Sequence, residues 1–339
     1  MTKAEEKGIF KAAVVVKDEL GLPNYMTMFY MEPGTYKEED VPDMFKIKGK
    51  TVPAILISQF HNTMINGVPV SLPYQQPKHT ISQDDAAIAC RKKGKGWHLM
   101  TNTEFVYLLH EAGEQGHTIG GNTNYGKNAK NPEEKGVLYD RCHTLTGCDP
   151  ISWSNDGTKA GVFGINGNFW EVVTGLRLHH GVVEYIKDND AAVAGYEDEA
   201  PEWLVAEVNG KPLKLHGSSD GGVKMSIADK IEEEWDGCHI SELQLDGLEE
   251  VPEIAYKLGI VPHDWKNETA GIWADSQLEE TVPFRGSSFH NASSGGGACL
   301  YLYGPRSCVN SNVSFRSALY LEDWKLITEL LGAGVTAHA

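Results

Sequence analysis

The sequence predicts an α+β protein whose strands are mostly antiparallel. Residues 298–303 alternate small or apolar side chains with tyrosine, a period of two that is typical of a half-buried strand. Asn66-Gly67 lies between two short apolar runs and indicates a tight β-hairpin. Two internal segments, which begin after Ser82 and Thr101, combine helical spacing with recognisable caps. Many strands together with two such helices define the predicted class.

The first half of the chain is expected to hold most of an antiparallel sheet. Residues 1–24 are predicted to form a separate N-terminal segment, in which residues 12–16 fit either a short strand or a helix. Apolar side chains alternate from Tyr25 to residue 31, and residues 55–57 form an apolar run, so each segment predicts a strand.

Both predicted helices carry their own start and stop signals. Acidic residues follow Ser82 and basic residues precede Gly94, which matches the polarity of a helix between these two positions. Thr101 and Glu104 have the spacing of a capping box, and apolar residues on one face follow them up to Gly113. The linker at 96–100 is expected to be a short buried strand or turn.

The second half is less regular. Short strands are expected at 151–153 and 161–163, and a turn at 166–168 precedes a strand whose hairpin partner is 182–186. Residues 187–280 show few periodic elements beyond 254–258, which predicts an insertion wrapped on the core. A terminal helix within 319–339 carries an apolar stripe, expected to dock on its own domain or on a second copy in a homo-oligomer. The stripe consists of Trp324, Leu326, Ile327, Leu330 and Leu331.

Length and charge restrict the class of protein. With 339 residues, of which 41% are hydrophobic, the chain can bury one large core or two ordinary ones. The formal net charge of −17 and the lack of a basic patch disfavour nucleic acid and anionic lipid as partners. The charged start and the short apolar run at 12–16 predict neither a secretion signal nor insertion into a membrane.

The six cysteines are scattered along a long chain, which does not indicate a disulfide framework, so we expect reduced thiols. Cys142 and His143, with Cys148 nearby, are the one group that hints at zinc. The group lacks a Cys-x-x-Cys pair and a second spaced histidine pair, so we expect no metal there.

The stretch from Gly286 to Ala318 has an unusual composition. It contains no Lys, Asp, Glu, Gln, Trp or Met, and its charged residues are Arg306 and Arg316, although 23% of the whole chain is charged. Small residues and tyrosine fill it instead, as in the adaptable surfaces of antibodies. The alternation at 298–303 indicates an ordered scaffold rather than a flexible Gly/Ser linker.

Three fragments in order resemble one known domain. GWHLMTNTEF, GVFGINGNFWEVVTGLRL and FRGSSFHN, with the closing NSNVSFRSA, resemble the C-type lectin fold of the formylglycine-generating-enzyme (sulfatase-modifying factor) type. Variable proteins of diversity-generating retroelements share that fold. The resemblance covers residues 25–318 and implies an α+β domain of the formylglycine-generating-enzyme-like subclass with long insertions.

The enzyme branch of this family implies a copper oxidase. Its members need two closely spaced cysteines just after an Arg-Gly-Gly-Ser motif, and here His290 and Gly295 occupy those places. Cys299 and Cys308 come later in the chain. A copper oxidase of the formylglycine-generating type remains the alternative from another class, and a plain structural tail protein is a third.

The variable-protein branch explains the missing residue types. In that family a reverse transcriptase mutates adenines, chiefly in Asn codons, so varied sites cannot become Lys, Glu, Gln, Trp or Met. The resemblance implies a hypervariable, non-enzymatic binding surface within about 286–316, on fixed positions such as Leu300, Leu302, Val313 and Phe315. The candidate ligand-binding residues are Phe289, His290, Asn291, Ser294, Gly297, Tyr301, Tyr303, Gly304, Arg306, Cys308 and Val309.

The function expected from this branch is receptor binding. The partner would be a protein or glycan on the surface of a target cell, and the chain would form a phage tail-fibre tip, found in the virion or in the cytoplasm before assembly. Taken singly, the same residues have plainer explanations: the tyrosines could cap a sheet face, His290 could satisfy a loop carbonyl, and Arg306 could be a surface charge.

Residues 167–171 carry the remaining metal candidate. In the related enzymes the carbonyl groups and the glutamate of this turn hold calcium, which implies Gly167, Phe169 and Glu171 as candidate ligands. The expected upstream Asn is Gly164 here. We therefore expect no cofactor, with Trp170 in the core and Glu171 bonded to backbone groups, and keep calcium as the alternative.

Overall fold

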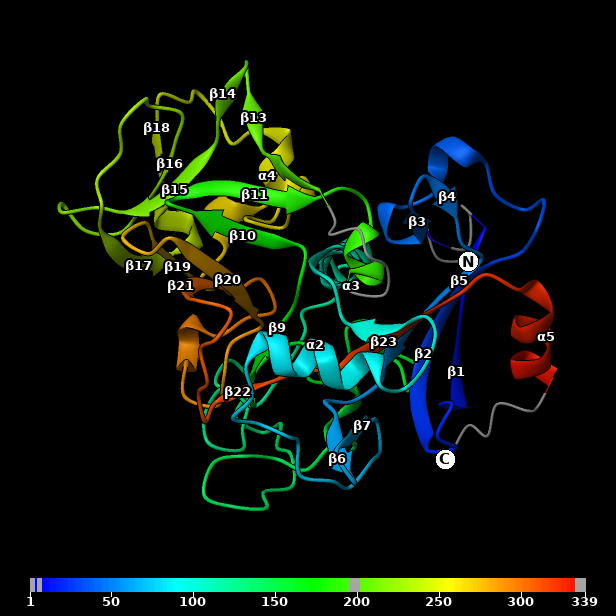
Figure 1. Cartoon of the computed structure of the whole chain (residues 1–339). Coiled ribbons are helices and arrows are strands. Elements are labelled where there is room, and N and C mark those ends of the chain that lie inside the picture. Colours follow the sequence, from blue (N-terminus) through cyan, green and yellow to red (C-terminus); the bar gives the residue numbers. More distant parts are fainter. Residues whose placement is uncertain (1–3, 5–7, 195–201, 333–339) are drawn as a thin grey trace.

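Two β-sheets hold most of the strands (Figure 1). The computed structural model describes residues 4, 8–194 and 202–332. The protein is a mixed α+β structure with mostly antiparallel strands and few helices. Within the described residues the parallel pairs are β9 with β22, β16 with β18 and β19 with β21.

The smaller sheet is antiparallel throughout and joins the two ends of the chain. β1 pairs with β2 along its whole length, from Ile9 opposite Met31 to Lys17 opposite Pro23. β23 lies inside the sheet, between β5 and β8. The predicted domain limits at residues 25 and 318 therefore cut through this sheet. The strand order is β1 (Ile9–Lys17), β2 (Pro23–Met31), β5 (Ala54–Ser58), β23 (Ser317–Leu321) and β8 (Trp97–Leu99).

The larger sheet draws most of its strands from the second half of the chain. Three strands lie off its main path: β12 (Trp203–Val205) pairs with β11, while β9 (Trp170–Val172) pairs with β20 and with β22 (Val313–Ser314). The main order is β17 (Trp235–His239), β19 (Gly271–Asp275), β21 (Leu300–Gly304), β20 (Glu280–Arg285), β10 (Leu176–His179), β11 (Val182–Ile186), β15 (Lys214–Gly217), β16 (Val223–Ser226) and β18 (Gln244–Asp246).

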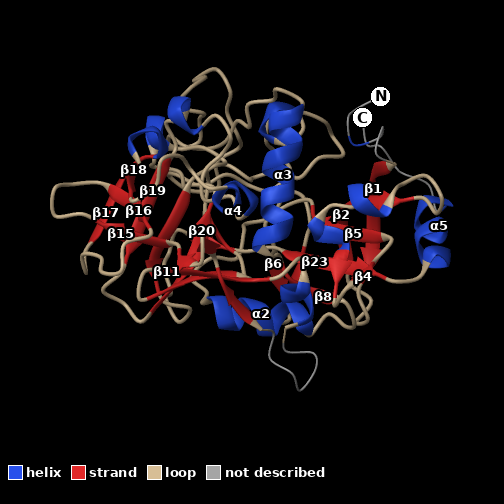
Figure 2. Cartoon of the chain, turned by 90° about the horizontal axis from the view of Figure 1, so that it is seen from above, coloured by secondary structure: helices blue, strands red, loops and turns tan. Residues whose placement is uncertain are grey.

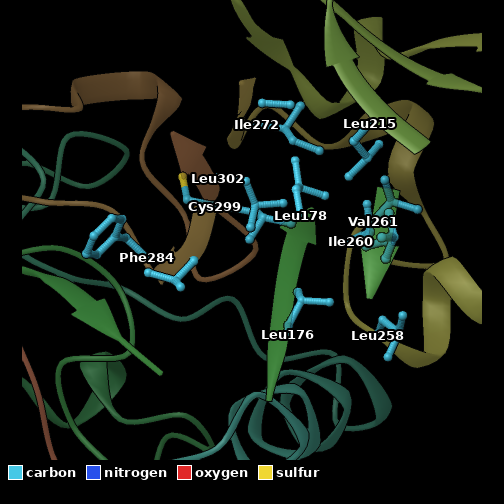
Figure 3. Packing of buried hydrophobic residues seen from close by; sticks show 14 of the residues in the cluster. Leu176, Leu178, Leu215, Leu258, Ile260, Val261, Ile272, Phe284, Cys299 and Leu302 are labelled. Carbon is cyan, nitrogen blue, oxygen red and sulfur yellow. The ribbon is translucent and has the colours of Figure 1, made fainter. Parts of the chain in front are cut away.

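The segment 187–280 is therefore not an insertion wrapped on a finished core. Most of its strands extend the larger sheet, and Leu215 and Ile272 are fully buried with Leu178 and Leu302 in one cluster (Figure 3). The prediction was wrong because these strands are three to five residues long, which is too short to display a clear period.

Two helices begin at the predicted caps. In α2 (Gln83–Arg91) the Ser82 hydroxyl accepts the Asp85 amide, and in α3 (Asn102–Glu114) Thr101 and Glu104 form the complete capping box. Figure 2 shows α3 between the two sheets. Phe105 of α3 is fully buried in the cluster that contains Phe29 and Ile57 of the smaller sheet. Helix α4 (Glu253–Lys257) is short. None of the helices in the described ranges is long and apolar enough to cross a membrane.

Several short elements complete the chain. The predicted Asn66-Gly67 turn joins β6 (Thr63–Ile65) and β7 (Val68–Val70), and both turn residues have positive φ, as a tight hairpin requires. Residues 151–153, predicted as a strand, form a 3₁₀ turn, and 161–163 contribute only an isolated bridge from Phe163 to Ser154. Two more hairpins are β3 (Lys46–Ile47) with β4 (Lys50–Thr51) and β13 (Glu207–Val208) with β14 (Lys211–Pro212).

The C-terminal helix α5 (Trp324–Gly332) docks on its own sheet, beside β1 (Figure 1). Ile327 is fully buried against a cluster that includes Val14 and Leu56, with Trp324, Leu330 and Leu331 partly buried around it. Leu326, expected in the same stripe, points away and is 41% exposed. Helix docking thus uses the predicted stripe within one chain; residues 333–339 of the predicted tail lie outside the described residues.

This docking predicts unequal effects of two neighbouring substitutions. Ile327→Ala should lower the free energy of unfolding by about 2 kcal/mol, because it removes a fully buried side chain. Leu326→Ala, the matched control, should change it by no more than about 0.5 kcal/mol. Chemical denaturation of both variants checks this, and light scattering should give the wild-type mass for each. Equal stability losses, or a smaller mass for Ile327→Ala, would show that α5 docks elsewhere.

Candidate functional site

Strand β21 presents the predicted tyrosines on one side and buries leucines on the other. Leu300 and Leu302 are fully buried, while Tyr301 and Tyr303 are half-buried on the opposite face. The alternation predicted from the sequence is therefore present, because successive side chains of a strand point to opposite faces of the sheet.

Tyr301 is more enclosed than a freely displayed side chain. Its ring lies 5.5 Å from that of Trp170, 5.7 Å from Trp273, 6.0 Å from Phe284 and 5.4 Å from Tyr303. Burial raises the pKa of Tyr301 to about 12, so the phenol remains protonated at neutral pH. Tyr301 therefore packs against the neighbouring rings and leaves only part of its own ring available for binding.

Tyr303 and Trp235 form the outer part of the same group. Their ring centroids are 5.1 Å apart, and Trp235 is 51% exposed. We call Trp170, Trp235, Trp273, Tyr301 and Tyr303 the aromatic patch. Large rings with few rotatable bonds are enriched at binding hot spots.

The sequence reasoning missed Trp235 and Trp273. Both belong to 187–280 and reach the patch through β17 and β19, where Trp273 lies opposite Tyr301 in a parallel pair. The run Gly271–Asp275 could have indicated Trp273, since its apolar residues are typical of a core strand.

Arg306 borders an open cleft beyond β21. Its guanidinium donates to both oxygens of Glu280, at 2.6 and 2.5 Å, and Arg177 donates to Oε1 of the same carboxylate at 3.0 Å. The hydrogen bond to Glu280 raises the pKa of Arg306, and Arg306 in turn lowers that of Glu280. The cleft has a volume of about 530 Å³, and its lining is Arg177, His179, Leu278, Glu279, Glu280, Pro305 and Arg306.

The loop after β20 carries a second group of candidates. Phe289 is half-buried, with its ring 5.4 Å from Tyr125 and 4.7 Å from His143, and His290 is exposed. Neighbouring atoms partly desolvate the His290 ring and lower its pKa, so the neutral form is favoured. Asn291 is bound within the loop, since its Oδ1 accepts from both the backbone and the hydroxyl of Ser288.

The remaining candidates differ in how much change they allow. Ser294 and Cys308 are half-buried, and Val309 is 53% exposed. Gly304 is buried, contrary to the expectation of a displayed position, and a Cβ there would lie 3.1 Å from the Phe284 ring. A Cβ at Gly297 would lie 3.0 Å from Leu109 of α3, so side chains at both glycines would press on fixed neighbours.

Residues Phe169 and Trp170 join the two groups. The Phe169 ring stacks on His143 at 4.3 Å, beneath Phe289, and the Trp170 ring contacts Tyr301. The candidates thus lie in three places: a loop patch at 289–294, β21 within the aromatic patch, and Arg306 on the rim of the cleft.

Glu171 is engaged by other side chains and not by backbone groups. Arg316 Nε and Nη2 donate to its two oxygens at 2.5 and 2.9 Å, and His61 Nε2 lies 3.3 Å from Oε2. Burial opposes the charged carboxylate, but Arg316 and His61 outweigh it and lower the pKa of Glu171. The carboxylate is thus neutralised by a buried guanidinium, which removes the acidic member of the candidate calcium set formed with Gly167 and Phe169. Trp170 is buried, as expected.

The two late cysteines do not meet. Cys299 precedes β21 and is fully buried, whereas Cys308 contacts Gly304 at the far end of that strand. The strand rise places these ends about 16 Å apart. Burial raises the pKa of both thiols, that of Cys299 to about 12, so neither is a preformed thiolate.

A small cavity of about 10 Å³ lies between Phe60, Trp153 and Asn168, with room for about one water molecule. Asp149 lines it together with His61 and Asn168, and Thr144 Oγ1 donates to the Asp149 carboxylate at 3.4 Å. Burial raises the pKa of Asp149 to about 7. The cavity is too small for an organic ligand.

Asp149 predicts a pH dependence of stability. Its pKa in the folded state lies above the ordinary 3.8, so the folded protein binds more protons than the unfolded one between these values. The free energy of unfolding should therefore fall as pH rises from about 4 to about 7. Asp149→Asn should remove this part of the dependence and be the more stable form near pH 8. Urea denaturation of both proteins at several pH values checks this; parallel curves would contradict it.

No protein-family model matches the chain, and no curated protein matches its sequence.

Proposed function

We propose that the chain is a non-enzymatic receptor-binding protein with a C-type lectin fold of the formylglycine-generating-enzyme type, a variable protein of a diversity-generating retroelement. Its hypervariable positions would lie on the aromatic patch, the loop patch and the rim of the Arg306 cleft. The partner would be a protein or glycan receptor on a target cell, bound by the tip of a phage tail fibre.

One observation carries this proposal. The stretch that lacks Lys, Asp, Glu, Gln, Trp and Met contains β21, whose buried leucines alternate with half-exposed tyrosines beside the exposed Trp235. A backbone fixed by Leu300 and Leu302 allows the opposite face to change at small cost in ordering. Of the eleven candidate residues, Gly304 alone is buried.

The copper-oxidase alternative has less support. Two thiols must reach one copper ion, and Cys299 and Cys308 lie at opposite ends of β21. A plain structural tail protein gives no reason why Lys, Asp, Glu, Gln, Trp and Met should all be absent from residues 286–318.

Sequencing the DNA on both sides of the coding region tests the proposal. We expect a reverse-transcriptase gene and a near-copy of the codons for about residues 286–316, with adenines at the candidate positions. Chains from related strains should then differ at these positions and agree at Leu300, Leu302, Val313 and Phe315. A coding region with neither neighbour would favour the structural protein.

A further inference from the structure

The loop at 139–143 brings together three side chains that suit a transition metal. Asp140 Oδ2 lies 2.8 Å from His143 Nδ1, and Cys142 Sγ lies 3.3 Å from the same nitrogen. One ligand atom from each of the three residues lies within 4.8 Å of the other two. We propose that Asp140, Cys142 and His143, the Asp-Cys-His cluster, bind one Zn²⁺ ion, with a water molecule in the fourth position.

The donor set favours zinc over calcium or magnesium. Thiolate and imidazole suit Zn²⁺, whereas the harder cations select oxygen. Tetrahedral zinc, with bonds of about 2.0–2.3 Å, separates its ligand atoms by about 3.3–3.6 Å. The Asp140 to His143 distance must therefore widen by about half an ångström on binding, which side-chain rotation can supply.

The backbone and neighbouring rings hold the ligands in place. Asp140 Oδ1 accepts the amides of Cys142 and His143, at 2.8 and 2.7 Å, which leaves Oδ2 to face the other ligands. The His143 ring is clamped between stacked Phe169 and edge-on Phe289. Asn122 donates to the Cys142 carbonyl at 2.7 Å. Such outer contacts orient metal ligands in known sites.

Zinc binding to the Asp-Cys-His cluster should depend on pH, because the Cys142 thiol must lose its proton. Burial and the Asp140 charge raise the pKa of Cys142, while the two backbone amides help to hold that of Asp140 at about 2 despite burial. Zinc would bind a thiolate and an unprotonated imidazole nitrogen, so the thiol would release its proton to solvent. Binding should therefore weaken as pH falls.

Cobalt(II) titration of the full, untagged chain after chelator treatment tests the site. We expect visible bands of tetrahedral cobalt and a near-ultraviolet thiolate-to-cobalt band that saturate at one ion per chain, and Zn²⁺ should displace both. Saturable bands that Zn²⁺ does not displace, or no bands at all, would overturn the proposal.

Matched variants assign the ligands. Cys142→Ser should abolish the thiolate band, whereas Cys148→Ser, which changes a thiol outside the cluster, should keep it. Asp140→Asn retains an acceptor for the amides, and His143→Phe retains the stacked ring, so both should fold; each should weaken cobalt affinity at least about tenfold. If Cys142→Ser does not fold, these two variants decide. Wild-type affinity in both, or loss of the band in Cys148→Ser, would contradict the assignment.

Discussion

Arg316→Met should lower the free energy of unfolding by about 3–5 kcal/mol, because it leaves the buried Glu171 carboxylate without its cation. Arg316 is fully buried and binds Glu171 through two donors, and its Nη1 also donates to the Ser58 carbonyl at 3.1 Å. Glu171→Leu should be destabilising to a similar degree, since it leaves the Arg316 guanidinium buried without an anionic partner. Urea denaturation of both variants measures the two losses.

The double variant separates the interaction energy of the ion pair from the cost of leaving one buried charge without a partner. Glu171→Leu with Arg316→Met replaces both charges by apolar side chains, so its loss should be clearly smaller than the sum of the single losses. Additive losses would show that the two residues do not act as a pair. The result also bears on the proposed variable region, because a residue that neutralises a buried carboxylate cannot vary freely. Arg316 should therefore be fixed, although it lies within 286–316.

Phe315→Ala should also cost about 3–5 kcal/mol, since its ring is fully buried and the cavity left behind cannot refill completely. Tyr301→Ala should cost about 2 kcal/mol, because four aromatic rings contact it. Tyr303→Ala, at the edge of the aromatic patch, should cost about 1 kcal/mol or less. Thermal and urea denaturation should reproduce this order.

Phe315→Leu is the control for this series and should cost less than about 1.5 kcal/mol, because it retains most of the apolar volume. Equal large losses for Phe315→Ala and Tyr303→Ala would show that the outer tyrosine is a core residue. That result would remove the aromatic patch as a binding surface.

Local signals in the sequence predicted local structure well. The Ser82 and Thr101 caps, the Asn66-Gly67 hairpin and the alternation on β21 each depend on residues within a few positions of one another. Asp140 was not predicted as a ligand, because the spacing of Cys and His residues gives no information on a carboxylate two residues before Cys142.

Long-range contacts were not readable from one sequence. Glu171 and Arg316 are 145 positions apart, and nothing near Glu171 indicates that its partner is a buried arginine. Trp235 reaches Tyr303 only because β17, β19 and β21 are neighbours in one sheet. The role of β1 was missed for the same reason, since its full-length pairing with β2 could not be read from residues 1–24 alone.

The most direct test of the account is a library in which His290, Tyr301, Tyr303, Arg306 and Val309 vary together while the rest of the chain is kept. Each member is scored twice, for folding by protease resistance and for binding to a panel of bacterial cells. A matched library at Leu300, Leu302, Val313 and Phe315 is the control. We expect most members of the first library to fold and to differ in the cells they bind, and most of the control library to unfold. A first library that is mainly unfolded, or whose folded members all share one binding profile, would contradict the proposal that these positions are free to vary.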